Sequence, residues 1–208
     1  MRTWKMADFN TKTLEIAHHR TTYRGVPCIK CPFDYVMYQM IISQIQPDLI
    51  IEIGTQSGGS ALYMADLLNN LGKGIIHTIN IADETNGNEL VANHPRIKRF
   101  IEGYQGYDLN LANGFESVLI IEDGSHTYQD VIGALRKFKN IVTPNSYLIV
   151  EDGIISELGY EGGFDGGPVR AIDEFLGENQ NYMLDEWWCN FYGQSATFNT
   201  NGFLKRIF

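Results

Sequence analysis

The sequence predicts an α/β protein with a doubly wound, mostly parallel sheet of seven strands that ends in an antiparallel hairpin. Two observations lead to this fold class. Short apolar runs rich in β-branched residues alternate with amphipathic helical patterns between residues 49 and 176. The dipeptide Asn201-Gly202 follows them and is typical of a hairpin turn. Because strands that alternate with helices pair in parallel and carry helices on both faces, we expect parallel strands followed by an antiparallel edge.

The length of the chain favours one domain. Its 208 residues, 44% of them hydrophobic, can bury a sizeable core, so we expect a single domain over residues 1–208. Residues 1–32 show only a weak helical pattern, over 8–19, and a turn-rich stretch that ends in proline. We expect this region to form an N-terminal arm or lid.

The first half of the chain then supplies three strands. Its expected elements are, in order, a helix over 33–46, a strand over 49–53, a helix with apolar positions over 61–71, a strand over 75–80, a short helix that reaches His94 and a strand over 97–101. Pro47 and Pro95 each end the helix before them, because proline cannot continue it.

The second half continues the alternation. Its expected elements are a strand over 117–123, a helix with an apolar face from Val131 to Phe138, a strand over 146–152, a glycine-rich loop over 153–167, a helix that starts at Pro168 and the hairpin at 201–202. Proline at the start of that last helix is favourable, since the first turn does not use its N–H group.

Net charge limits the partners. The formal charge is −9 and the pI is near 5, which argues against nucleic acid and against anionic membrane surfaces. No apolar run reaches the roughly 18 residues of a membrane-spanning helix, and the first residues lack the apolar core of a signal peptide. We therefore expect a cytoplasmic protein.

The three cysteines do not form a disulfide framework, since their number is odd. Cys28 and Cys31 have the spacing of a zinc half-site, and His18 and His19 lie upstream. No second pair completes a tetrahedral site, so buried thiols are the favoured interpretation.

The stretch LIIEIGTQSGGS, residues 49–60, is the strongest local signal. A buried strand runs into a loop with Gly54, Gly58 and Gly59, after which a helix begins, as in a nucleotide-type pocket. The glycine spacing departs from GxGxxG, whose second glycine makes room for a pyrophosphate. A ligand without phosphates, such as S-adenosylmethionine, fits better. A βα turn without a ligand is the alternative.

Polar side chains end the predicted strands. In an open α/β sheet, ligands bind beyond the carboxyl ends of the strands, where this chain has Glu52, Asn80, Asp123, Glu151 and Asp152. Three of these, Asp123, Glu151 and Asp152, offer the hard oxygen ligands that suit Mg²⁺. Solvated strand ends that face separate directions are the alternative.

His126 lies three residues after Asp123, at the start of the next helix. A histidine near a metal and a bound hydroxyl is a natural general base. A helix cap or a surface residue is the alternative interpretation.

Five motifs carry a resemblance to a known family. They are KCPFDYVMYQ at 30–39, IEIGTQSGGSAL at 51–62, EDGSHTYQDV at 122–131, SYLIVEDG at 146–153 and NTNGFLKRI near the C-terminus. From about residue 25 onward the chain resembles the cephalosporin hydroxylase and rhamnosyl O-methyltransferase family. This implies a Rossmann-like class I methyltransferase that uses S-adenosylmethionine.

The resemblance also implies roles for site residues. The cofactor site would involve Glu52, Gly54, Thr55, Gly58, Ser60, Asn80 and Asp123, and Mg²⁺ would be held by Asp123, Glu151 and Asp152. The separation 151 − 123 = 28, followed by an adjacent acid, also matches catechol O-methyltransferase-like enzymes. In those enzymes the base is a lysine three residues past the first ligand, and His126 stands at that place here.

Two positions depart from the family pattern. Asn80 replaces the usual acid for the ribose hydroxyls, and it can hydrogen-bond but carries no charge. Asp83 could substitute for it from the following loop. After the third strand, Tyr104 and Gln105 stand where many relatives have an aspartate.

These features predict a Mg²⁺-dependent O-methyltransferase that acts on a hydroxyl of a small molecule, by resemblance a sugar, glycan or natural product. The loop 153–167 and the aromatic residues Trp187, Trp188, Phe191 and Tyr192 could form the acceptor walls, although core or dimer contacts explain the aromatic residues equally well. The alternatives are a non-catalytic S-adenosylmethionine-binding or scaffold protein of this fold, and an NAD-type oxidoreductase. A homo-oligomer is compatible with the sequence.

Overall fold

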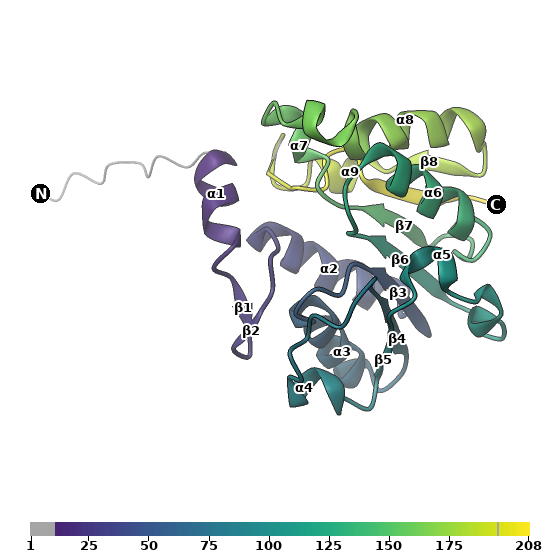
Figure 1. Cartoon of the computed structure of the whole chain (residues 1–208). Coiled ribbons are helices and arrows are strands. Elements are labelled where there is room, and N and C mark those ends of the chain that lie inside the picture. Colours follow the sequence, from purple (N-terminus) through teal and green to yellow (C-terminus); the bar gives the residue numbers. More distant parts are fainter. Residues whose placement is uncertain (1–10, 195) are drawn as a thin grey trace, which may run out of the picture.

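The structure, a computed structural model, describes residues 11–194 and 196–208 (Figure 1). Its main sheet has seven strands in the order β5-β4-β3-β6-β7-β9-β8. The strands are β3 (Leu49–Ile53), β4 (Ile75–Ile79), β5 (Ile97–Phe100), β6 (Val118–Glu122), β7 (Tyr147–Val150), β8 (Tyr182–Leu184) and β9 (Phe203–Arg206). The strands β3 to β7 are parallel, and β9 is antiparallel to both β7 and β8. The predicted fold class is thereby confirmed.

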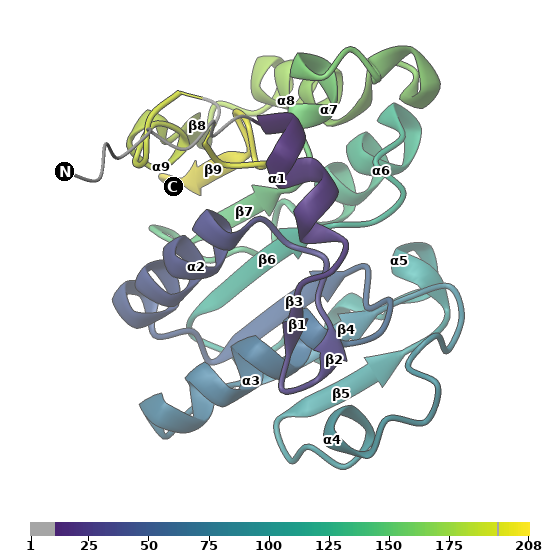
Figure 2. The same cartoon turned by 90° about the vertical axis from the view of Figure 1, so that its left-hand side faces the viewer.

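Helices cover both faces of the sheet (Figure 2). One face packs on α2 (Pro32–Ile45) and α3 (Gly59–Leu71), the other on α6 (Tyr128–Phe138) and α8 (Gly167–Glu178). Side chains alternate along each strand, so Ile50 joins the core under α2 and α3, whereas Ile51 and Ile53 join the core under α6 and α8. Burial on both faces explains why the predicted strands are apolar at nearly every position.

Shorter elements connect these layers. They are α1 (Thr11–His18), β1 (Thr22–Tyr23), β2 (Val26–Pro27), α4 (Glu89–Ala92), α5 (Gly103–Gly106), η1 (Leu109–Ala112), α7 (Ile154–Glu157), η2 (Glu161–Phe164) and α9 (Glu186–Cys189). The helix predicted over 8–19 corresponds to α1, while residues 8–10 lie outside the described part of the chain. Two short helices, α7 and η2, occupy the glycine-rich loop predicted over 153–167.

The sequence predicted that the Asn201-Gly202 turn joins two strands of a hairpin, but in the structure it does not. Residues 185–202, which include α9, connect β8 to β9, and the turn only leads into β9. The Gly202 N–H donates to the Asn199 carbonyl oxygen at 2.8 Å, and Asn201 has a φ of 55°. A Cβ at residue 202 would lie 1.9 Å from the Val150 carbonyl oxygen, so the close approach to β7 requires glycine here.

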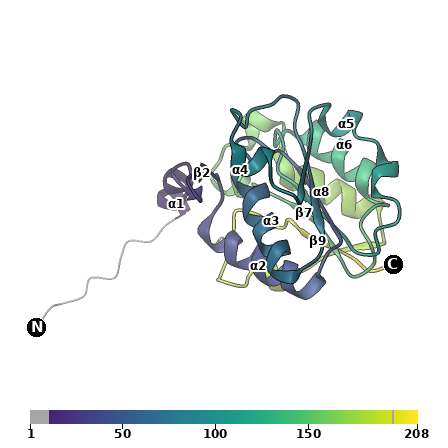
Figure 3. The same cartoon turned by 90° about the horizontal axis from the view of Figure 1, so that it is seen from below.

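Residues 19–31 form an arm that packs on α3, while α1 lies to one side of the layered body (Figure 3). Asp66 of α3 accepts hydrogen bonds from the Tyr23 hydroxyl and the Arg24 guanidinium, both at 3.0 Å. A Cβ at Gly59 would lie 2.2 Å from the Pro27 carbonyl oxygen. Glycine at the start of α3 therefore lets the arm approach the carboxyl edge of the sheet. Within residues 11–194 and 196–208, no helix has the length and apolar character needed to span a membrane.

Candidate active site

A cavity of about 340 Å³ opens at the carboxyl ends of the parallel strands. Ile53 and Gly54 line it after β3, Asn80 after β4, and Glu122 and Asp123 after β6. Further lining residues come from loops and helix starts, namely Ile29, Gln56, Ile81, Glu84, Gly103, Tyr104, Gln105, Gly124, Ser125, His126, Asp130 and Asp152. The site thus lies where the strand order reverses between β3 and β6, as expected for a doubly wound sheet.

Gly54 brings the β3 loop close to the end of β6. Its φ is 105°, and a Cβ there would lie 1.8 Å from the Asp123 carbonyl oxygen. Both the backbone conformation and the close approach exclude larger residues. Gly54 also lines the cavity, so a ligand can contact its backbone directly.

Four of the predicted cofactor residues, Glu52, Thr55, Gly58 and Ser60, do not line the cavity. Glu52 is fully buried, and its carboxylate accepts hydrogen bonds from the hydroxyl groups of Ser60 and, at 2.6 Å, Thr78. The hydroxyls of Thr55 and Thr78 are 2.6 Å apart and extend this network. Burial raises the pKa of Glu52. These residues fix the glycine loop from behind the cavity wall.

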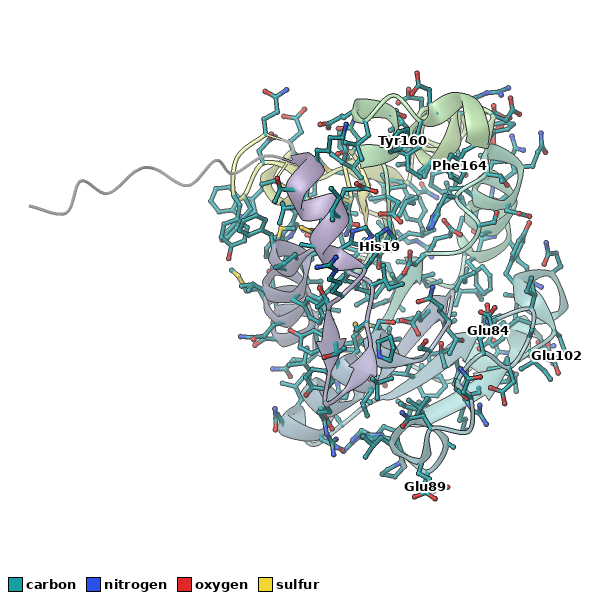
Figure 4. All side chains as sticks on the ribbon, turned by 60° about the vertical axis from the view of Figure 1, so that its left-hand side comes forward. His19, Glu84, Glu89, Glu102, Tyr160 and Phe164 are labelled. Carbon is teal, nitrogen blue, oxygen red and sulfur yellow. The ribbon has the colours of Figure 1, made fainter. Side chains whose placement is uncertain are left out.

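The loop after β4 places Glu84, and not Asp83, at the cavity. The Asn80 amide donates to Glu84 Oε2 at 2.9 Å and to the Ala82 carbonyl oxygen at 3.0 Å. Asp83 forms an ion pair with Arg99 at 2.9 Å and does not line the cavity. In Figure 4, Glu84 lies on the side of the molecule that carries β4 and β5. A sequence signal that could have found Glu84 is its position. It is an acid in the loop that follows β4, and no acid stands at the end of β4 itself.

Three predicted residues meet on the other side of the cavity. One ligand atom from each of Asp123, His126 and Asp152 lies within 4.8 Å of the others, and the His126 Nε2 to Asp152 Oδ2 distance is 3.2 Å. Among the residues that the structure describes, no other group of three or more histidine, cysteine or acid side chains is close enough together to hold a metal ion. His126 and Asp152 have φ values of 59° and 57°, a left-handed conformation that is uncommon outside glycine and concentrates at functional sites.

Glu151, the third predicted metal ligand, is directed toward Lys30. The Lys30 ammonium donates to Glu151 and, at 2.8 Å, to Asp123 Oδ2, and the Tyr38 hydroxyl donates to Glu151 at 2.8 Å. Lys30, Tyr38 and Glu151 are all buried. The sequence alone indicates no role for Lys30, although this residue opens one of the five motifs.

The charges of this cluster influence one another. Burial raises the pKa of Glu151 to about 6 and also raises the pKa of Asp123 and Asp152, with the neighbouring carboxylates adding to the effect. Burial lowers the pKa of His126, but the surrounding carboxylates, Asp152 first, outweigh it and leave that pKa above its ordinary value. In the same way, Asp123 and Glu151 hold the pKa of Lys30 well above its ordinary value despite burial.

Glu122 also lines the cavity, although nothing in the sequence singled it out. Burial raises its pKa to about 7. One oxygen, Oε1, accepts from the Gly124 N–H at 3.1 Å, whereas Oε2 is buried and has no partner in the described part of the chain. Buried polar atoms are normally paired, so this unpaired oxygen in a residue that lines the cavity marks Glu122 as a candidate site residue.

The aromatic residues proposed as acceptor walls pack elsewhere. Trp188 is buried and its indole N–H donates to the Tyr147 hydroxyl at 3.2 Å, while Trp187 is 68% exposed. None of Trp187, Trp188, Phe191 and Tyr192 lines the cavity. Tyr104 is the aromatic residue that lines the cavity. Phe164 of η2 (labelled in Figure 4) lies near His126, with 6.4 Å between the two ring centroids.

Cys28 and Cys31 are free, buried thiols, as the favoured interpretation expected. Burial raises the pKa of Cys28 to about 11 and that of Cys31 to about 12, so neither is a ready thiolate ligand. Cys31 Sγ instead donates to the Ala196 carbonyl oxygen at 3.5 Å.

Comparison with known proteins identifies the family of this chain. Residues 16–207 match the family described as Rhamnosyl O-methyltransferase/CmcI. The chain belongs to this family. The Rhamnosyl O-methyltransferase/CmcI family comprises S-adenosylmethionine-dependent O-methyltransferases, as the five sequence motifs implied.

Named relatives support the assignment to the Rhamnosyl O-methyltransferase/CmcI family. The Rhamnosyl O-methyltransferase of Mycobacterium tuberculosis (strain ATCC 25618 / H37Rv) is 31% identical over 202 residues, covering 90% of this chain and 78% of the relative. That of Mycobacterium leprae (strain TN) is 29% identical over 198 residues, covering 89% and 83%.

Solved structures of relatives share the fold. The structure titled "cmcI-N160 SAH" superposes with a TM-score of 0.68 at 18% identity, covering 100% of this chain and 97% of that one. The structure titled "cmcI-D160 Mg-SAM" has a TM-score of 0.66 at 20% identity, covering 91% and 78%. The O-methyltransferase TomG from Streptomyces achromogenes has a TM-score of 0.61 at 14% identity, covering 95% and 89%.

Proposed function

We propose that this protein transfers a methyl group from S-adenosylmethionine to a hydroxyl group of a small molecule, a sugar or a glycosylated natural product, with Mg²⁺ as the metal. The observation that carries the proposal is that Asp123, His126 and Asp152 lie close together and line the same cavity as Gly54. The curated relatives named as rhamnosyl O-methyltransferases support the sugar acceptor.

The cavity has the features that S-adenosylmethionine needs. Gly54 leaves its backbone open to the ligand, and Asn80 with Glu84 offers an amide and a carboxylate at one side. Glu122 and Asp123 offer carboxylate oxygens at the end of β6, where they can bind the ammonium group of the methionine portion. The loop has no GxGxxG spacing, which favours this cofactor over NAD.

The acidic cluster fits Mg²⁺. Asp123 and Asp152 supply hard oxygen ligands within reach of one another, and a divalent cation would relieve the repulsion between them. Bound Mg²⁺ would lower the pKa of an acceptor hydroxyl, and S-adenosylmethionine would supply the methyl group. Glu151 belongs to the same cluster through its contact with Lys30.

His126 is the proposed base. When bound, S-adenosylmethionine would supply the methyl group to the acceptor oxygen and leave with its sulfur, and His126 would take the proton that the hydroxyl loses. Asp152 holds the imidazole at 3.2 Å and stabilises its protonated form. Phe164, whose ring centroid lies 6.4 Å from that of His126, and Tyr160, which is near Phe164 in Figure 4, are available to contact the acceptor.

Calorimetric titration with S-adenosylmethionine and with NAD, each with and without Mg²⁺, tests the proposal. We expect S-adenosylmethionine to bind and NAD not to bind. A radiolabelled-methyl assay with rhamnosyl and other sugar acceptors should then show transfer that stops in EDTA. Binding without transfer to any hydroxylated acceptor would favour a non-catalytic protein of this fold, and binding of NAD alone would favour the oxidoreductase.

A further inference from the structure

We propose that Lys30 is a built-in counter-cation of the active-site carboxylates, which takes the place of the metal charge in the metal-free protein and weakens metal binding. This inference rests on the proposed Mg²⁺ site and adds a residue that controls it. Lys30 belongs to the arm, between β2 and α2, and not to the strand ends that carry the acids.

The contacts of Lys30 tie two strand ends together. Its ammonium reaches Asp123, after β6, and Glu151, after β7, and these residues are 93 and 121 positions away in the sequence. In the described part of the chain, Lys30 is the lysine or arginine that forms an ion pair with either acid. Without it, the buried carboxylate of Glu151 and the half-buried carboxylate of Asp123 would lie close together with no cation between them.

The surroundings hold the ammonium in place. Lys30 is 3% exposed, and the Tyr38 ring centroid lies 5.7 Å from its Nζ. The Tyr38 hydroxyl donates to Glu151 and accepts from the Asn199 amide at 3.1 Å. The preceding residue, Ile29, lines the cavity, so the docked arm places Lys30 directly behind its wall.

Lys30 shares Asp123 with the candidate metal group. Asp123 accepts from the ammonium at 2.8 Å and also belongs to the group with His126 and Asp152. A divalent cation bound there would be repelled by the ammonium across a low-dielectric region, so metal affinity is lower than the two carboxylates and the imidazole alone would give. The same ammonium keeps the carboxylates assembled when no metal is bound.

Substitution of Lys30 separates these two effects. In K30M we expect the affinity for Mn²⁺, measured by electron paramagnetic resonance without S-adenosylmethionine, to rise by about tenfold or more because the repulsion is removed. In EDTA the melting temperature of K30M should fall below that of the wild-type protein. Addition of about 10 mM Mg²⁺ in place of EDTA should restore much of this loss. Wild-type protein should gain far less from Mg²⁺.

Two further variants distinguish charge from packing. K30M/E151Q removes one charge of each sign, so its stability in EDTA should recover relative to K30M. K73M, which removes a partly exposed lysine paired with Asp48, should leave Mn²⁺ affinity and the response to Mg²⁺ unchanged.

The proposal is overturned if K30M binds Mn²⁺ no more tightly than wild type, or if neither protein binds Mn²⁺. It is also overturned if K30M is unstable in EDTA to the same degree with and without E151Q, since packing would then explain the loss. These readouts need no methyl transfer, so a failure of the proposed activity with normal Mn²⁺ binding would be recognised separately.

Discussion

The two sides of the cavity differ in how their buried carboxylates are satisfied. On the β3–β4 side, Glu52 accepts from the hydroxyls of Ser60 and Thr78 and is not exposed to the cavity. On the β6–β7 side, Glu122 has one oxygen and His126 one nitrogen that are buried and lack a partner among the described residues. Buried polar groups are normally paired, so the first arrangement is typical of a scaffold, whereas unpaired groups of the second kind beside a cavity are typical of a functional site.

The largest expected effect is the loss of the proposed base on the β6–β7 side. We expect H126A to lower the rate of methyl transfer by about 10²- to 10⁴-fold while S-adenosylmethionine binding is retained. Single-turnover kinetics and calorimetry measure the two quantities. His94, which pairs with Asp66 away from the cavity, supplies the control variant H94A. An unchanged rate in H126A would remove this histidine from the mechanism.

On the β3–β4 side, the expected effect is on stability. E52A would leave the hydroxyls of Ser60 and Thr78 without their buried acceptor, so the free energy of unfolding should fall by about 2–4 kcal/mol. E122A, which removes a carboxylate that is only half satisfied, should cost less. Urea denaturation of both variants makes the comparison, and equal losses would contradict the distinction between the two sides.

Acid should destabilise the β4 strand through His77. Burial lowers the pKa of this residue from 6.5 to about 4 in the folded protein. The unfolded chain therefore binds a proton first, and stability should fall by up to about 2–3 kcal/mol as the pH drops from 6.5 to 4. Denaturation curves of H77Q over this range should show a shallower decline. A parallel decline in both proteins would assign the acid sensitivity to other groups.

The smallest expected effect concerns the loop after β4. E84Q should weaken S-adenosylmethionine binding by about three- to tenfold, because a charged acceptor at the cavity becomes neutral. D83N is the matched control, since Asp83 pairs with Arg99 outside the cavity. Calorimetric titration decides between the two loop acids. A larger effect in D83N would restore the assignment made from sequence.

The sheet was predictable because its information is local. Apolar runs with β-branched residues mark β3, β6 and β7, and the residues that follow them necessarily reach one edge of a parallel sheet. The convergence of Asp123 and Asp152 followed from this argument alone. The Asn201-Gly202 dipeptide misled, because a turn signal does not specify whether a strand precedes it.

The sequence did not show which of the acids would be hydrogen-bonded within the protein and which would not. Glu52 and Glu122 both stand at or near the ends of apolar strands, and only the three-dimensional neighbours show which one is satisfied. Lys30 lies 121 residues from Glu151, and no local pattern indicates that the two will meet. Such contacts depend on how the arm crosses the sheet, which composition and periodicity do not encode.

The hydrogen bond from Asn199 to Tyr38 has a consequence for the order in which the protein assembles. Tyr38, near the beginning of the chain, donates a hydrogen bond to Glu151, the partner of Lys30. It also accepts one from Asn199, near the end of the chain. Contacts between such distant positions form late, because long stretches of chain must be ordered first. A ribosome-bound chain that has not yet released residue 199 could build the parallel sheet but would lack this part of its charged centre.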